Sequence, residues 1–229
     1  MISRDLLNAV DPVGWTRRTL GFEPDSNQQI ILASTHKRIL LNCSRQWGKS
    51  TVTAAKAVHR ALEFPERLII AMSPSARQTG ELMRKLETFL RQCGVRIKGD
   101  GSNEMSILLP NGSRIVGLPG GESTIRGFSA VNLLIVDEAA RVPDESYRAA
   151  RPMLAVANGD LLLLSTPYGK RGFFYEEWIG QSDWLRIQVR AEDCPRIPQE
   201  FLADERRSFP LELVAVFHNL QPEIFARQI

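Results

Sequence analysis

The chain has 229 residues, of which 43% are hydrophobic and 24% charged, a composition ordinary for a soluble globular protein of one or two domains. Its formal net charge of +3 at pH 7 neither demands nor excludes a nucleic-acid partner. Cys43, Cys93 and Cys194 lie far apart and no apolar run approaches the roughly 20 residues that span a bilayer, so we expect no disulfide framework, structural zinc site or membrane span.

The first 60 residues predict short helices, then a strand, a loop and a longer helix. Proline and glycine interrupt residues 1–35, which therefore read as short helices. Residues 38–42 form an apolar run that predicts a buried strand. After a glycine-containing loop, residues 50–63 are rich in alanine with apolar side chains at helical spacing. Strand, loop and helix in this order are the local context of a phosphate-binding loop.

The middle of the chain alternates strands with helices. Residues 67–72 predict a second buried strand, and 77–93 a helix with one apolar face. Residues 106–109 and 114–118, separated by Pro110-Asn111-Gly112, predict a β-hairpin. Strands at 132–136 and 160–164 flank a helix at 144–154. This alternation predicts an α/β fold whose mostly parallel sheet has helices on both faces, with a small helical appendage from Gly169 onward.

Residues 43–50 match the P-loop pattern G-x-x-x-x-G-K-[ST] except that Cys43 replaces the first glycine. In such a loop, backbone amides and a helix N-terminus point at phosphate oxygens. Lys49 would neutralise the β- and γ-phosphates of ATP, and the Ser50 hydroxyl would ligate Mg²⁺. The predicted nucleotide-binding residues of this loop are Ser44, Arg45, Gln46, Trp47, Gly48, Lys49, Ser50 and Thr51.

Two carboxylates, Asp137 and Glu138, directly follow the apolar run 133–136 and so lie at the carboxyl end of a predicted strand. Ligands of open α/β sheets bind at that edge. We expect Asp137 to hold Mg²⁺ through a hydration water and Glu138 to polarise the water that attacks ATP. The alternative is a pair of acids that cap the next helix.

A third motif, Ser165-Thr166-Pro167, ends another apolar run. Hydroxyl groups there would sense the γ-phosphate and transmit its loss to the following segment. The alternative is a simple strand-to-turn stop, because serine and proline terminate strands.

Two further residues are weaker candidates. The Gln28 amide has a donor and an acceptor that match the adenine edge, but an exposed helix residue is the alternative. Arg126 lies in a glycine-rich loop 12 residues before Glu138 and would serve as an arginine finger, although most loop arginines are only solvated.

Together these motifs resemble the ATPase domain of the large terminase subunit, the DNA-packaging motor of tailed phages. The resemblance runs from about Asn27 to Arg207. It includes the Pro-Asp-x-x-Gln stretch ending at Gln28, a P-loop without its first glycine, Ser73-Pro74, and the Asp137-Glu138-Ala139 and Ser165-Thr166-Pro167 motifs. Ile125-Arg126-Gly127 also fits.

The resemblance implies a RecA-like P-loop fold of the additional-strand catalytic-glutamate type. Residues 1–168 would be the ATPase core with a helical extension, and residues 169–229 a lid or linker subdomain. Arg126 becomes the preferred finger, acting on a neighbouring subunit. The implied partners are double-stranded DNA, a portal protein, a small terminase subunit and further copies in a ring, in the host bacterial cytoplasm with no membrane.

One departure and two rival functions remain. Family members normally continue into a nuclease domain, and no acidic, strand-rich region follows residue 207 here, so we expect no nuclease activity in this chain. A helicase or other RecA-type DNA translocase shares the same motifs. A non-catalytic assembly protein with a degenerate P-loop is the rival from another class, and Cys43 is the argument for it.

Overall fold

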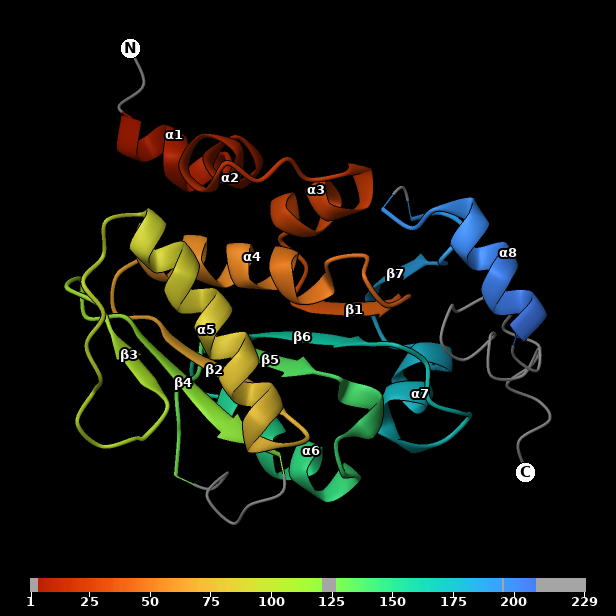
Figure 1. Ribbon diagram of the computed structural model, residues 1–229. Helices are drawn as coiled ribbons and strands as arrows, with labels where there is room; N and C mark the ends of the chain where they lie inside the picture. The colour runs from red at the N-terminus through yellow and green to blue at the C-terminus, as the bar shows by residue number, and fades with distance from the viewer. Residues whose placement is uncertain (1–3, 121–126, 195, 209–229) are drawn as a thin grey trace.

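The computed structural model describes residues 4–120, 127–194 and 196–208 (Figure 1). Its strands are β1 (Arg38–Cys43), β2 (Leu68–Ser73), β3 (Ser106–Leu108), β4 (Arg114–Pro119), β5 (Leu133–Asp137), β6 (Asp160–Ser165) and β7 (Leu185–Val189). They form one sheet in the order β3-β4-β2-β5-β6-β1-β7. Neighbouring strands run parallel throughout, except that β3 is antiparallel to β4. The predicted mostly parallel sheet is confirmed.

Helices cover both faces of this sheet (Figure 1). They are α1 (Arg4–Val10), α2 (Pro12–Leu20), α3 (Ser26–Ala33), α4 (Lys49–Glu63), α5 (Ala76–Gln92), α6 (Asp144–Ala150), α7 (Gly172–Ile179) and α8 (Gln199–Ser208). One face carries α4 and α5, with α1 to α3 packed beyond α4, and the other carries α6 and α7. No helix of the described residues is long and apolar enough to cross a membrane.

Alternate residues of each strand point into different cores, which explains the uninterrupted apolar runs. In β1, Ile39 and Leu41 join the core beneath α4 and α5, while Leu40 joins the core beneath α6. Each of these side chains is at most 2% exposed. A strand that is buried on both faces has no polar side to show in the sequence.

A buried lysine fastens α3 to α4, the helix that follows the P-loop. The Lys56 ammonium is 3% exposed and donates hydrogen bonds to the carbonyls of Ile31 (2.9 Å), Leu32 (3.3 Å) and Ser34 (2.9 Å). Carbonyls at a helix C-terminus have no partner within their own helix, so the lysine supplies the donors that α3 lacks. Because Gln28 lies on α3, this contact also fixes Gln28 relative to the P-loop helix.

In the middle of the chain, one predicted element is confirmed and another is partly wrong. The predicted hairpin is the antiparallel pair of β3 and β4. The predicted helix 144–154 is wrong in its last four residues, because α6 ends at Ala150 and a 3₁₀ turn follows at Arg151–Leu154. Pro152 has no amide hydrogen to continue an α-helix.

The region after Gly169 is not purely helical, contrary to the sequence prediction, because β7 joins the sheet parallel to β1. The sequence does not reveal β7, since it is an edge strand of the form Leu-Arg-Ile-Gln-Val with only two buried residues. Half-exposed strands alternate polar and apolar residues and lack the apolar run that marks the other parallel strands.

Replacement of Lys56 by methionine should lower the free energy of unfolding by about 2–4 kcal/mol, because two buried carbonyls and one partly buried carbonyl lose their donor and methionine supplies none. Urea unfolding of both proteins measures the difference. Lys37→Met is the matched control, because Lys37 is 56% exposed and its bridge to Asp160 should contribute at most about 1 kcal/mol. Equal losses for the two variants would contradict the role given to Lys56.

Candidate nucleotide-binding site

The strand order brings the three predicted motifs to one edge of the sheet. β6 lies between β1 and β5, so their carboxyl ends are neighbours. The P-loop follows β1, the acid pair ends β5, and Ser165-Thr166-Pro167 ends β6. Segments that are up to about 120 residues apart in the sequence therefore meet at the edge where ligands of open α/β sheets bind.

The P-loop adopts a turned conformation without its first glycine. Cys43 is the last residue of β1 and fully buried in the core, so nothing at this position requires left-handed backbone. Gln46 (φ 65°) and Gly48 (φ 97°) supply the turn instead. A side chain at position 48 would also lie 3.1 Å from the Gln28 amide nitrogen. Position 43 therefore needs no glycine, the turn strains Gln46 instead, and Gly48 is required.

Lys49 points back into the loop. The residue is 7% exposed, and its ammonium donates a hydrogen bond to the Ser44 carbonyl at 3.1 Å. No salt bridge among the described residues involves Lys49, so its charge is available to a bound anion.

Ser50 and Asp137 meet as a magnesium site requires. The Ser50 hydroxyl donates to Asp137 Oδ2 at 3.1 Å, although the two residues are 87 positions apart. Burial, and secondarily the Glu138 carboxylate, raise the pKa of Asp137 to about 6. Mg²⁺ prefers oxygen ligands and binds with one or two protein groups plus phosphate oxygens and water. A hydroxyl and a buried carboxylate in contact fit that requirement.

Glu138 is held in strained backbone beside Asp137. Its φ of 50° is uncommon for a residue other than glycine. Its amide donates to Asp137 Oδ1 at 2.9 Å, and its carboxylate accepts a long hydrogen bond of 3.5 Å from the Thr166 hydroxyl. Ser165 Oγ accepts from the Ala140 amide at 3.2 Å, which fixes the turn after Glu138. The third motif thus contacts the acid pair directly, and its predicted coupling role stays a prediction.

Gln28 is buried and does not lie on an exposed helix face, so that alternative is wrong. Its amide nitrogen donates to the Trp47 carbonyl at 3.1 Å, and its oxygen accepts from the Asp25 amide at 3.0 Å. It also lines the pocket described below. Gln28 therefore supports the P-loop backbone, and its predicted contact with adenine stays a prediction.

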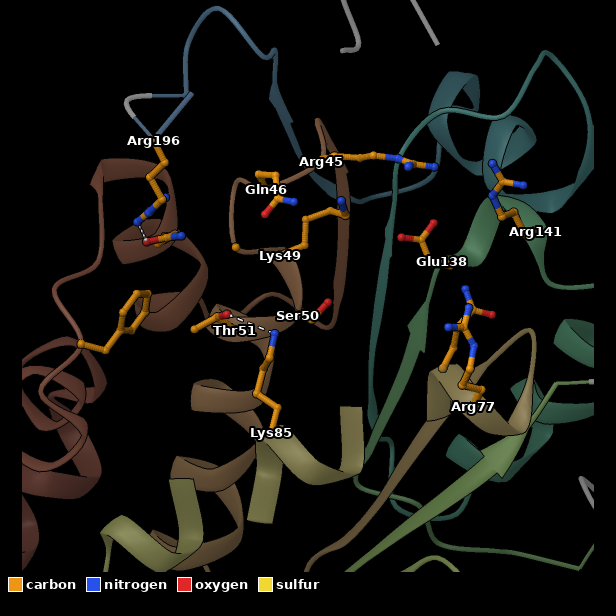
Figure 2. Close-up of a pocket in the computed structure, with 14 residues that line it drawn as sticks. Arg45, Gln46, Lys49, Ser50, Thr51, Arg77, Lys85, Glu138, Arg141 and Arg196 are labelled. Carbon is orange, nitrogen blue, oxygen red and sulfur yellow. Dashed lines mark hydrogen bonds between the residues drawn. The ribbon is translucent and has the colours of Figure 1, made fainter. Parts of the chain in front are cut away.

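A pocket of about 840 Å³ opens over the P-loop (Figure 2). Of the predicted site residues, those that line it are Gln28, Arg45, Gln46, Gly48, Lys49, Ser50, Thr51 and Glu138. The Trp47 side chain does not line it, because it is 1% exposed and packs in the core. Arg126 lies outside the described residues.

Four cationic residues of this pocket were not predicted as nucleotide ligands. They are Arg77, Lys85, Arg141 and Arg196. Arg77 and Lys85 point into the pocket (Figure 2), and Lys85 donates to Thr51 Oγ1 at 3.3 Å. No sequence signal distinguishes these cations from solvated ones, since the packing of α5 against α4 brings Arg77 and Lys85 to the pocket, and Arg141 and Arg196 reach it from other segments.

Residues 40–206 match the family described as "Terminase large subunit, T4likevirus-type, N-terminal". The terminase large subunit of Thermus virus P23-45 is 28% identical over 179 residues, which cover 70% of this chain and 37% of that relative. The chain therefore spans well under half of its relative's length.

Solved structures agree on the fold. The large terminase ATPase domain of Thermus phage P74-26 superposes with a TM-score of 0.78 at 21% identity, over 91% of this chain and 98% of that one. The large terminase of another thermophilic bacteriophage, solved in complex with ADP, gives a TM-score of 0.67 at 17% identity, over 93% and 52% of the two chains.

Gly48→Ala should destabilise the protein by about 1–2 kcal/mol, because alanine is strained at positive φ and its methyl group would meet Gln28. Gly80→Ala is the opposite control. Gly80 lies inside α5 with open space around its Cβ position, so alanine there should stabilise by about 0.5–1 kcal/mol. Urea unfolding measures both. A neutral or stabilising Gly48→Ala substitution would contradict the loop conformation described.

Proposed function

The chain belongs to the terminase large-subunit family, and we propose that it is an ATP-hydrolysing motor domain that moves double-stranded DNA into a procapsid. The observation that carries this proposal is the contact of Asp137 with Ser50, which lines the pocket together with Lys49 and Glu138. A hydroxyl, a buried carboxylate, a second carboxylate and an ammonium, the groups that the P-loop and the acid pair contribute to phosphoryl transfer, therefore come together there.

The charge of the pocket favours a polyphosphate. Six cationic side chains and one carboxylate line it among the described residues: Arg45, Lys49, Arg77, Lys85, Arg141, Arg196 and Glu138. An excess of positive charge in a concave site attracts and holds an anion such as a nucleoside triphosphate. The N-terminus of α4, which begins at Lys49, adds its partial positive charge at the same place.

ATP hydrolysis would need three roles: holding the metal ion, orienting the water, and binding the phosphates. Ser50 and Asp137 would hold Mg²⁺, which neutralises charge on the phosphate oxygens when bound. Glu138 would orient the attacking water and accept its proton. Lys49 would leave the Ser44 carbonyl and pair with the β- and γ-phosphates.

The Ser165-Thr166-Pro167 motif and the segment after β6 would transmit the loss of the γ-phosphate. Thr166 contacts Glu138, so a change around Glu138 reaches the turn that follows β6. The Ser44 amide donates to the Val189 carbonyl at 2.8 Å, which ties the P-loop to the end of β7. The proposed division into an ATPase core of residues 1–168 and a following lid or linker therefore needs β7 to count with the core sheet, and the segment beyond β7 is the part that would follow the nucleotide state.

Membership of the terminase family favours a packaging motor over a helicase. The further partners belong to the same proposal: a portal protein, a small terminase subunit and other copies of this chain in a ring around DNA, in the host bacterial cytoplasm.

Glu138→Gln should reduce ATP hydrolysis at least about 100-fold while nucleotide affinity stays within a few fold, because the amide cannot accept the proton of water. Phosphate release with and without linear double-stranded DNA measures the rate, and EDTA should abolish it. Glu145→Gln, which removes an exposed carboxylate from α6, is the control. Equal slow hydrolysis by wild type and Glu138→Gln would instead favour a non-catalytic assembly role.

Arg126 is proposed to act on the ATP of a neighbouring subunit, so activity should return when two inactive variants are mixed. Arg126→Ala and Glu138→Ala chains should each be inactive alone, and a mixture should regain part of the wild-type rate, because some interfaces join an intact arginine to an intact glutamate. Phosphate release across mixing ratios measures the effect. Absence of rescue at every ratio would place Arg126 in its own subunit's site or outside catalysis.

A further inference from the structure

Arg196 connects the segment after β7 to the P-loop and to α3. Its guanidinium donates to the Trp47 carbonyl at 2.8 Å and to Gln28 Oε1 at 3.4 Å, and it lies 3.4 Å from Asp25 Oδ2. These partners precede it by 149 to 171 residues. An arginine that reaches three groups at the rim of a ligand pocket is placed to contact the ligand as well.

The position of Arg196 identifies the end of the nucleotide that it would meet. Figure 2 shows Arg196 and Glu138 at opposite ends of the pocket, with Gln46 and Lys49 between them. In the proposed function, Glu138 acts at the γ-phosphate and the P-loop surrounds the other phosphates. The base and ribose must then extend toward Arg196.

The Gln28 oxygen at that end is already occupied. A carbonyl oxygen has two lone pairs, and here they accept from the Asp25 amide at 3.0 Å and from Arg196 at 3.4 Å. The amide nitrogen donates to the Trp47 carbonyl. While Arg196 stays in place, Gln28 has no acceptor left for the amino group of adenine. The predicted contact of Gln28 with adenine would require Arg196 to move, and with Arg196 in place another group has to recognise the base.

Arg196 has further N–H groups with which it can recognise the base-and-ribose end of the nucleotide. A guanidinium has five N–H groups, and the contacts above use three of them. The side chain is 41% exposed and lines the pocket together with Phe22. Phe22 lies three residues before Asp25, at the same end of α3. A planar cation and an aromatic ring both stack on a nucleobase, and the remaining N–H groups can donate to ring nitrogens or ribose oxygens.

We propose that Arg196 binds the base-and-ribose end of the nucleotide, so that the segment following β7 supplies part of the nucleotide site. The inference rests on the proposed nucleotide-binding function and extends it. Nucleotide affinity then depends on the position of this segment, which leads into α8.

The test compares ATP with inorganic tripolyphosphate, which has the phosphates but no base or ribose. Arg196→Ala should weaken Mg²⁺-ATP binding about 10- to 100-fold, the loss typical of a hydrogen bond from a charged group, and leave the tripolyphosphate Kd within about twofold. Arg196→Lys, which keeps the charge but not the planar fork, should fall between. Isothermal titration calorimetry measures each Kd, and thermal unfolding verifies that the variants are folded.

Arg207→Ala is the matched control, because Arg207 lies on α8, is 76% exposed and should leave both affinities unchanged. Equal weakening of ATP and tripolyphosphate by Arg196→Ala would show that Arg196 only supports the P-loop, and unchanged ATP binding would show no contact. Either result overturns this inference while wild-type ATP binding still upholds the proposed function. Failure of the wild type to bind ATP would remove both.

Discussion

The position of β6 between β1 and β5 is the constraint on which the rest of the site depends. It sets the distance between the strand that precedes the P-loop and the strand that carries the acid pair. With one strand between them, the Ser50 hydroxyl reaches the Asp137 carboxylate, and Thr166 at the end of β6 reaches Glu138. Directly paired strands would leave no place for the third motif, and a wider separation would part the hydroxyl from the carboxylate.

The surrounding structure stabilises three residues whose burial or backbone conformation is unfavourable by itself. Lys49 and Asp137 are ionisable groups less than 10% exposed, and Glu138 has left-handed backbone. Each has a specific support: the Ser44 carbonyl for Lys49, the Ser50 hydroxyl for Asp137, and the Asp137 carboxylate for the Glu138 amide. Such supports hold the site in a conformation that a bound triphosphate and metal ion would stabilise further.

The elements that can be predicted from the sequence are those with a local signal. Buried strands are marked by apolar runs, and the P-loop by Gly48, Lys49 and Ser50 between a strand and a helix. β7 escapes prediction because it is half exposed, and α6 ends earlier than predicted because Pro152 cannot continue the helix. The resemblance to the terminase family predicts that these motifs belong to one nucleotide site. The family match over residues 40–206 agrees with that resemblance.

The sequence alone determined which reactive side chains are available, because Gly48, Lys49, Asp137 and Glu138 belong to motifs that are local in the sequence. Only the tertiary structure decided which other groups share the pocket. Arg196 reaches it from beyond β7, and nothing in its neighbouring residues distinguishes it from a solvated arginine. The physical reason is that side-chain chemistry is local in sequence, whereas a pocket is made by strand order and helix packing, which join distant segments.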